Sequence, residues 1–111
     1  MPATYDDANL LVQLLRWGAD IELPNAIGEV FSDAFESEAA DGQDPAVRTV
    51  LSFFETIGTF VKQGILSRDL VEDLFWIDGI WRRVQAAALK QRESAGESRL
   101  YENFERLATR A

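Results

Sequence analysis

The side chains in this sequence that are capable of chemistry are mostly carboxylates. The chain contains no histidine and no cysteine, which excludes the usual nucleophile–base pairs, zinc sites and disulfide bonds. Two pairs of acids are spaced three residues apart, Asp69 with Glu72 and Glu102 with Glu105, so each pair would share one face of a helix. Two helices that each present such a pair could hold Mg²⁺ or Mn²⁺ between them, because hard cations prefer oxygen ligands.

This spacing resembles the acidic pairs of all-helical nucleotide pyrophosphohydrolases of the MazG type. The resemblance implies a divalent-metal-dependent phosphohydrolase whose ligands are Asp69, Glu72, Glu102 and Glu105. The same residues also have a structural interpretation. Asp69 suits the first turn of a helix, where negative charge is favourable, and Glu102 and Glu105 are spaced like residues on a solvated helix face. The phosphohydrolase is therefore the alternative hypothesis.

A second group of candidates consists of aromatic and basic residues suited to binding. Trp76 and Trp81 are followed by Arg82 and Arg83, a combination typical of cation–π or ligand-stacking surfaces. Residues five apart on a helix point about 140° apart. We therefore expect one tryptophan in the core and the other facing solvent or a partner.

Glu55 is the remaining candidate, because it lies within an otherwise apolar helical segment. A carboxylate in such surroundings can take part in proton transfer. Glu55 also belongs to a narrow polar stripe with Arg48, Thr59 and Lys62, and this stripe favours a structural interaction instead.

The segment DPAVRTVLSFFETIGTFVKQGIL, residues 44–66, predicts the central helix that positions these candidates. Asp44 is a suitable N-cap, and Gly64 is a suitable left-handed residue after the helix end. Apolar residues recur at helical spacing and leave little of the surface polar, so neighbouring helices must cover this one. Ser67 then caps a helix expected from Arg68 to about Arg92. The short connection predicts an antiparallel hairpin at the centre of the fold, with a bend at Gly79.

Further helices are predicted on both sides of this hairpin. A capping box formed by Thr4 and Asp7 opens the first helix, which Gly18 is expected to end. Pro24 opens a second, whose expected buried side runs through Phe31 to Phe35, and Ser98 caps the last. An acidic loop is expected from residue 36 to residue 44. No segment has the alternation of a strand, so we predict an all-α single domain over residues 1–111, a compact bundle of about five helices.

The composition and the net charge limit the kinds of partner that we expect this protein to bind. The 111 residues are 47% hydrophobic and 27% charged, as is typical of a globular protein, and the net charge is −8. Such a charge disfavours binding to a nucleic-acid backbone, although acids arrayed on one surface could mimic one. No apolar run is long enough to span a bilayer, and the first residues are acidic rather than a signal sequence. We expect a cytoplasmic protein that binds no membrane, needs no cofactor, and associates with a protein partner or with itself.

Several segments resemble a bacterial family of small all-helical proteins that is described only as a domain of unknown function. These segments are RWGAD, LSFFETIGTFVKQGILSRDLVEDLF, the region of Trp81, and YENFERLA. The resemblance implies an all-helical fold and no particular reaction. The leading hypothesis is therefore a non-enzymatic interaction or regulatory module whose binding residues include Trp76, Trp81, Arg82 and Arg83.

Overall fold

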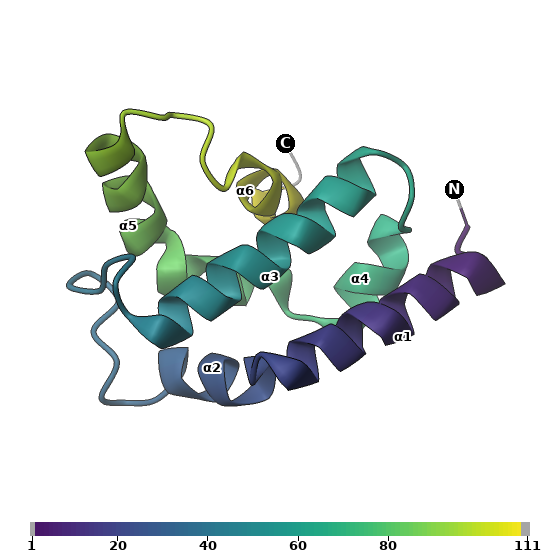
Figure 1. Cartoon of the computed structure of the whole chain (residues 1–111), viewed down its shortest axis with the longest axis horizontal. Coiled ribbons are helices and arrows are strands. Elements are labelled where there is room, and N and C mark those ends of the chain that lie inside the picture. Colours follow the sequence, from purple (N-terminus) through teal and green to yellow (C-terminus); the bar gives the residue numbers. More distant parts are fainter. Residues whose placement is uncertain (1, 110–111) are drawn as a thin grey trace.

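The computed structural model describes residues 2–109, and within that range its regular elements are all helices, joined by turns and irregular segments. The all-α prediction is confirmed, and Figure 1 shows the helices arranged around the long diagonal helix α3. No helix in the described part of the chain is long and apolar enough to cross a membrane. The helices are α1 (Tyr5–Asp20), α2 (Leu23–Val30), α3 (Pro45–Lys62), α4 (Arg68–Leu74), α5 (Ile77–Ala95) and α6 (Glu102–Thr109).

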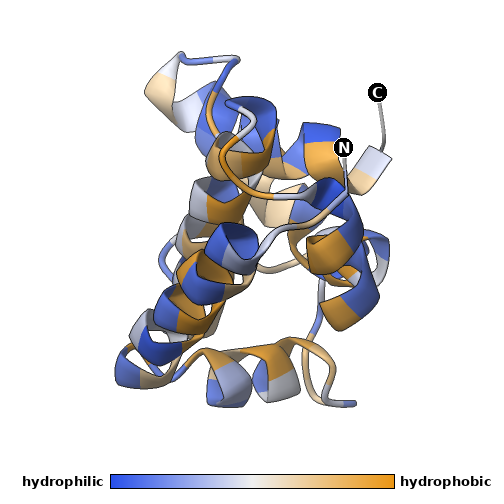
Figure 2. Cartoon of the chain, turned by 90° about the vertical axis from the view of Figure 1, so that its right-hand side faces the viewer, coloured by the Kyte–Doolittle hydropathy of each residue, from blue (hydrophilic) through white to orange (hydrophobic). Residues whose placement is uncertain are grey.

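Helix α3 is the centre of the fold, as predicted. The Asp44 carboxylate accepts a hydrogen bond from the Ala46 N–H (2.9 Å), which satisfies a donor that the helix leaves free. At the other end Gly64 adopts φ +76°, and the Ile65 N–H returns to the Phe60 carbonyl (2.9 Å) in a Schellman ending. Helix α3 packs mainly against α2 on one side and α6 on the other. In Figure 2 each helix carries both hydrophobic and hydrophilic residues, which fits helices that bury only one side.

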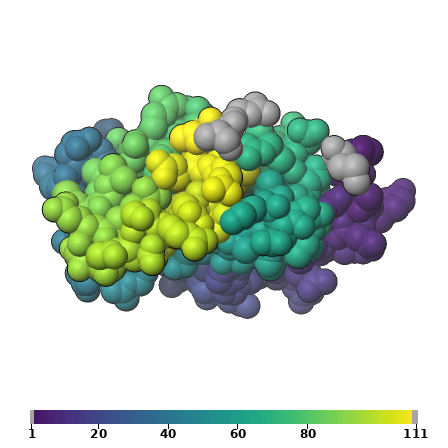
Figure 3. All heavy atoms as spheres, turned by 90° about the horizontal axis from the view of Figure 1, so that it is seen from above, coloured from purple at the N-terminus to yellow at the C-terminus, as the bar shows by residue number. Residues whose placement is uncertain are grey.

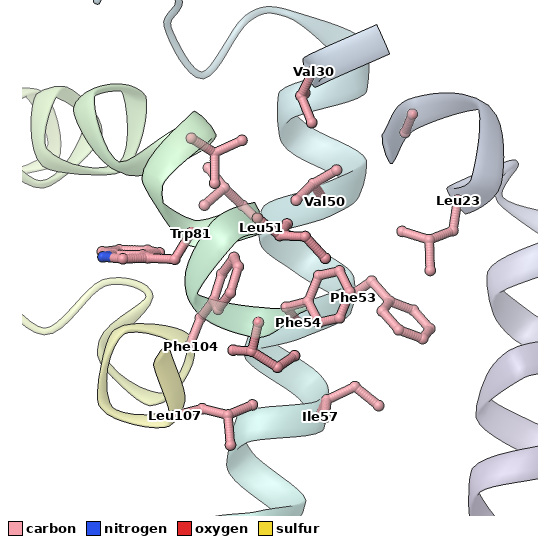
Figure 4. Close-up of a cluster of buried hydrophobic side chains, with 14 of the residues drawn as sticks. Leu23, Val30, Val50, Leu51, Phe53, Phe54, Ile57, Trp81, Phe104 and Leu107 are labelled. Carbon is pink, nitrogen blue, oxygen red and sulfur yellow. The ribbon is translucent and has the colours of Figure 1, made fainter. Parts of the chain in front are cut away.

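Aromatic rings from α3, α5 and α6 lie close together in the middle of the core (Figure 4). Phe54 is fully buried and meets Phe75 edge-on (5.1 Å between centroids), and it also lies against Phe104 (5.2 Å). Phe53 packs edge-on against Phe54 (5.1 Å) and stacks with Trp17 (5.3 Å). These contacts connect α1, α3, α6 and the α4–α5 junction, so the candidate residues are held by one continuous core.

The prediction of one helix from Arg68 to Arg92 is wrong. The chain leaves the helix at Phe75, which is extended (φ −122°, ψ 142°), and α5 starts at Ile77. The break lets the partly buried Phe75 ring pack edge-on against Phe53 and Phe54. Gly79, where a bend was expected, is instead a buried residue near the start of α5.

Three other predicted helix boundaries are also wrong. Helix α1 continues past Gly18 to Asp20, because Gly18 is buried against the Phe53 ring and does not end the helix. Helix α2 stops at Val30, earlier than the apolar pattern through Phe35 indicates. Helix α6 starts at Glu102 and is not capped by Ser98.

Candidate protein-interaction site

Trp81 lies in α5 and Trp76 is the N-cap residue of that helix, and the two side chains have different environments. Trp81 is 3% exposed and meets the Phe104 ring edge-on (4.9 Å between centroids), so it is part of the core. Trp76 is 63% exposed, although it is among the largest apolar side chains in the chain. The structure therefore identifies Trp76 as the tryptophan that is available to a partner.

Trp76 is held in place although it is exposed. Its ring stacks on Phe31 (5.8 Å between centroids, 12° between planes), and it covers Gly79. A Cβ atom on Gly79 would lie 2.6 Å from Cε3 of Trp76, so only glycine leaves room for the indole there. The Arg82 guanidinium lies 5.8 Å from the centroid of the Trp76 ring, close enough for a cation–π contact. We call Phe31, Trp76 and Arg82 the aromatic platform.

Arg82 and Arg83 have different roles, although they are adjacent in sequence. Arg82 is exposed and makes an ion pair with Asp78 one turn earlier (3.3 Å). Arg83 donates from Nε to the Val30 carbonyl (2.6 Å) and also lies over the ring of Phe31 (5.9 Å). Because Val30 ends α2, Arg83 satisfies a carbonyl that the helix leaves free and positions Phe31 in the platform.

The acidic segment between α2 and α3 is held by bases of α5 through its backbone. Lys90 donates from Nζ to the carbonyls of Glu38 (2.6 Å) and Ala40 (3.3 Å), and Arg83 donates to that of Phe35 (3.4 Å). These bonds attach the segment to α5 through its carbonyl groups.

A groove with a volume of about 470 Å³ lies beside the platform at the α4–α5 junction. Trp76 forms part of its wall, together with Leu74, which is 50% exposed. The groove also contains three carboxylates, and its full lining is Glu72, Asp73, Leu74, Phe75, Trp76, Ile77, Asp78, Leu107 and Ala108. An aromatic wall combined with carboxylates favours a cationic group of a partner.

The four carboxylates proposed as metal ligands are not brought together. Asp69 lies in a different hollow from Glu72, Glu102 pairs with Arg99 (3.0 Å), and Glu105 pairs with Arg92 (2.9 Å). Within residues 2–109 no three acidic side chains are grouped so that they could hold a metal ion. Arg99 also lowers the pKa of Glu102, chiefly by donating a hydrogen bond to its carboxylate. Each pair lies on one helix, α4 or α6, but the four side chains have separate surroundings.

Glu55 acts as a cap for a helix from another part of the chain. Its carboxylate accepts hydrogen bonds from the Phe104 N–H (2.9 Å) and from the Asn103 side-chain amide (2.8 Å) in the first turn of α6. These are donors that a helix start leaves free, and negative charge is favourable there. Figure 3 shows α6, in yellow, between α5 and the end of α3. This contact gives Glu55 a structural role that accounts for a carboxylate in this apolar helix.

A hollow of about 580 Å³, larger than the groove, lies where α1 begins and α3 ends, and its lining contains both acidic and basic side chains. Asp7 is one of its residues and connects two helix starts. Its carboxylate accepts a hydrogen bond from the Thr4 N–H (2.8 Å), which completes the predicted capping box. It also accepts a hydrogen bond from the Ser67 N–H (3.0 Å) at the start of α4. The Thr4 N–H is the largest cause of a lowered pKa of Asp7. Desolvation opposes this effect, and the bonds from the Thr4 hydroxyl and the Ser67 N–H add to it.

The lowered pKa of Asp7 makes a prediction about acid denaturation. A carboxyl whose pKa is lower in the folded chain stabilises the fold above its unfolded pKa, and this stabilisation is lost as the pH falls through the folded pKa. We expect urea denaturation curves from about pH 5 to about pH 2 to show a smaller loss of stability for Asp7→Asn than for the wild type. Asp6→Asn, on the exposed neighbour, is the control and should follow the wild type. A wild-type pH profile for Asp7→Asn would contradict the assignment.

Comparison with known protein families agrees with the resemblance seen in the sequence. The family model described as a domain of unknown function, DUF4760, matches residues 12–111. The chain belongs to the DUF4760 family. No curated protein and no solved structure matches it. The matched part of the DUF4760 domain contains the whole aromatic platform, the groove beside it and the Glu55 contact with α6.

Sequence reasoning missed Phe31 as a member of the site in this DUF4760 domain. Phe31 is far from Trp76 in sequence, and its spacing predicts a place on the buried side of a longer α2. The early end of α2 at Val30 turns the Phe31 ring toward Trp76 instead. No local pattern indicates this contact, since it depends on the packing of α2 beside α5.

Proposed function

We propose that this DUF4760 domain is a non-enzymatic, cytoplasmic interaction module that docks a basic segment of another protein on the aromatic platform. The observation that carries the proposal is the state of Trp76, which is 63% exposed yet fixed by Phe31, Arg82 and Gly79. Most large apolar side chains of a folded domain gain stability by burial, so a fixed and exposed tryptophan favours a surface that a partner covers.

The composition of the platform supports a protein partner. Tryptophan and arginine are enriched among the residues that contribute most to the binding energy of protein interfaces. Because the Trp76 ring is already held in place, binding would cost little side-chain conformational entropy. Leu74, half exposed beside Trp76 in the groove, adds apolar surface to the same region.

The charge near the platform supports a basic partner. Three carboxylates, those of Glu72, Asp73 and Asp78, line the groove next to Trp76. The chain as a whole carries a net charge of −8, which attracts a cationic partner over distances of about 10 Å at ordinary ionic strength. A lysine or arginine of the partner would bind in the groove beside the indole ring and near Glu72 and Asp73, because Asp78 already pairs with Arg82, which lies over the ring.

The test is affinity capture from the native host followed by binding measurements with the purified partner. We expect Trp76→Ala to weaken binding about 30-fold, as a loss of about 2 kcal/mol at an interface hot spot would. Leu89→Ala is the matched control. Leu89 is also an apolar residue of α5 whose side chain is exposed (44%). It lies about 20 Å from Trp76 along the helix axis, because an α-helix rises about 1.5 Å per residue. This variant should bind as the wild type does.

Circular dichroism of both variants separates lost binding from lost folding. Since Trp76 is mostly exposed, both variants should retain the wild-type helical signal. Arg83 is unsuitable for this test, because its bonds to Val30 and Phe35 are part of the fold. If Trp76→Ala and Leu89→Ala capture and bind the partner equally well, the platform is not the docking surface.

A further inference from the structure

The hollow of about 580 Å³ where α1 begins and α3 ends is lined by charged side chains of both signs. Its three bases come from α3, α4 and α6, and its three acids come from α1 and α4. Within residues 2–109 none of the three bases forms an ion pair. The six residues are Lys62, Arg68, Arg106, Asp6, Asp7 and Asp69.

Arg68 is the base of this hollow that the fold holds in place. Its side chain is partly buried, and Nη1 donates to the Leu107 carbonyl of α6 (3.1 Å). That bond uses one of the five N–H donors of the guanidinium, and the others have no carboxylate partner in the described part of the chain. The planar fork of an arginine matches the two oxygens of a carboxylate or phosphate. Arg68 is therefore suited to hold an anionic group of a ligand, and Lys62 and Arg106 add positive charge nearby.

The acids of the hollow decide which kind of anion fits. Asp7 is used by the fold, because its carboxylate accepts from the N–H groups of Thr4 and Ser67. Asp6 and Asp69 are exposed and form no ion pair within residues 2–109. These carboxylates repel a polyanion such as a nucleotide, and the three bases repel a plain cation. A ligand that carries one charge of each sign is attracted by both sets of side chains.

The size of the hollow and its apolar wall narrow the ligand class further. A volume of about 580 Å³ lies within the range of small-molecule sites, roughly 300–1,000 Å³. Part of the wall consists of apolar side chains, including those of Val61, Ile65, Leu66 and Leu107. A carboxylate, an ammonium group and an apolar side chain on one carbon atom are the features of an apolar α-amino acid.

We propose that this hollow binds a free apolar α-amino acid. The carboxylate of the ligand lies against Arg68, its ammonium group lies near Asp6 and Asp69, and its side chain lies along Val61 and Leu107. None of the residues of the aromatic platform lines the hollow, so amino-acid binding does not depend on the proposed docking function.

Thermal unfolding of the full chain with five free amino acids tests the ligand class. The five are L-valine, L-leucine, L-isoleucine, L-methionine and L-phenylalanine. We expect at least one of them to raise the melting temperature by about 5 °C or more when it is present at about ten times its Kd. Calorimetry then compares that amino acid with its amide, which lacks the carboxylate, and with its deaminated acid, which lacks the ammonium group. Both should bind at least about tenfold more weakly, because each loses one charged contact.

Two outcomes of the ligand series would overturn the proposal. The first is that none of the five amino acids binds or raises the melting temperature. The second is that the deaminated acid, or inorganic phosphate, binds as tightly as the amino acid, which would make the hollow a plain anion site.

Substitutions test where the amino acid binds. Arg68→Gln should weaken binding about tenfold or more, since it removes a charged donor. Arg16→Gln is the matched control, because Arg16 is an exposed arginine of α1 that does not line the hollow. Asp69→Asn, at an exposed position, should also weaken binding and gives a second test if Arg68→Gln loses its helical signal in circular dichroism. Trp76→Ala should bind the amino acid as the wild type does, which separates this site from the platform. Wild-type affinity in both Arg68→Gln and Asp69→Asn would overturn the assignment.

Discussion

Replacing Gly58 with alanine is expected to lower the free energy of unfolding by about 3 kcal/mol, which is near the upper end of overpacking effects. Gly58 is buried where α3 crosses the start of α6. An added Cβ would overlap the carbonyl oxygen of Asn103 and lie 2.6 Å from its carbonyl carbon and 3.1 Å from the Phe104 nitrogen. These are backbone atoms, so the overlap is relieved only if α6 moves away from α3. The movement would also stretch the hydrogen bonds from α6 to Glu55.

Gly28→Ala is the matched control for Gly58→Ala. Both glycines lie within helices, but a Cβ on Gly28 would have no atom within 4 Å. Alanine has a higher helix propensity than glycine, so Gly28→Ala should stabilise the fold by up to about 1 kcal/mol. Urea denaturation at neutral pH measures both changes. If Gly58→Ala is as stable as the wild type, α3 and α6 do not approach as closely as the structure shows.

Replacing Glu55 with alanine should lower the free energy of unfolding by about 3 kcal/mol, since hydrogen bonds to a charged group contribute roughly 1.5–3 kcal/mol each when their donors are partly buried. The substitution removes the acceptor of the Phe104 N–H and of the Asn103 side-chain amide, at the start of α6. It also removes a negative charge from the N-terminal end of that helix. We expect α6 to loosen from α3 and the cooperative transition to shift to lower urea concentration.

Two further substitutions make the Glu55 test specific. Glu55→Gln keeps one oxygen acceptor and should cost less than Glu55→Ala. Glu93→Ala removes an exposed carboxylate from α5 and should change stability by about 0.5 kcal/mol at most. Hydrogen exchange at the Phe104 amide reports directly on the bond to Glu55. A similar effect of Glu55→Ala and Glu93→Ala would show that Glu55 does not hold α6 in place.

Local signals predicted the starts of helices well. The side chains of Thr4, Asp44 and Ser67 each accept a hydrogen bond from an N–H two or three residues later in the chain. These bonds involve neighbouring residues, so a short stretch of sequence contains all the information that they need. The Schellman ending at Gly64 is predictable for the same reason.

The boundaries that were predicted wrongly are those decided by distant contacts. Helix α4 ends at Phe75 because the partly buried Phe75 ring packs edge-on against Phe53 and Phe54, whereas apolar periodicity alone predicts a continuous helix there. Helix α6 needs no local cap at Ser98, because Glu55 supplies the acceptor from α3. In both cases tertiary packing overrides the local preference.

The sequence by itself determined that this DUF4760 chain is all-helical, that α3 must be covered on most sides, and that Trp76 and Trp81 cannot share a helix face. Only the tertiary structure decided that Trp76 is the exposed one, that Phe31 stacks on it, and that Arg83 belongs to the fold while Arg82 belongs to the surface. The physical reason is the range of the interactions. Helix formation and capping depend on residues within one or two turns, whereas burial depends on which helices the completed core brings together.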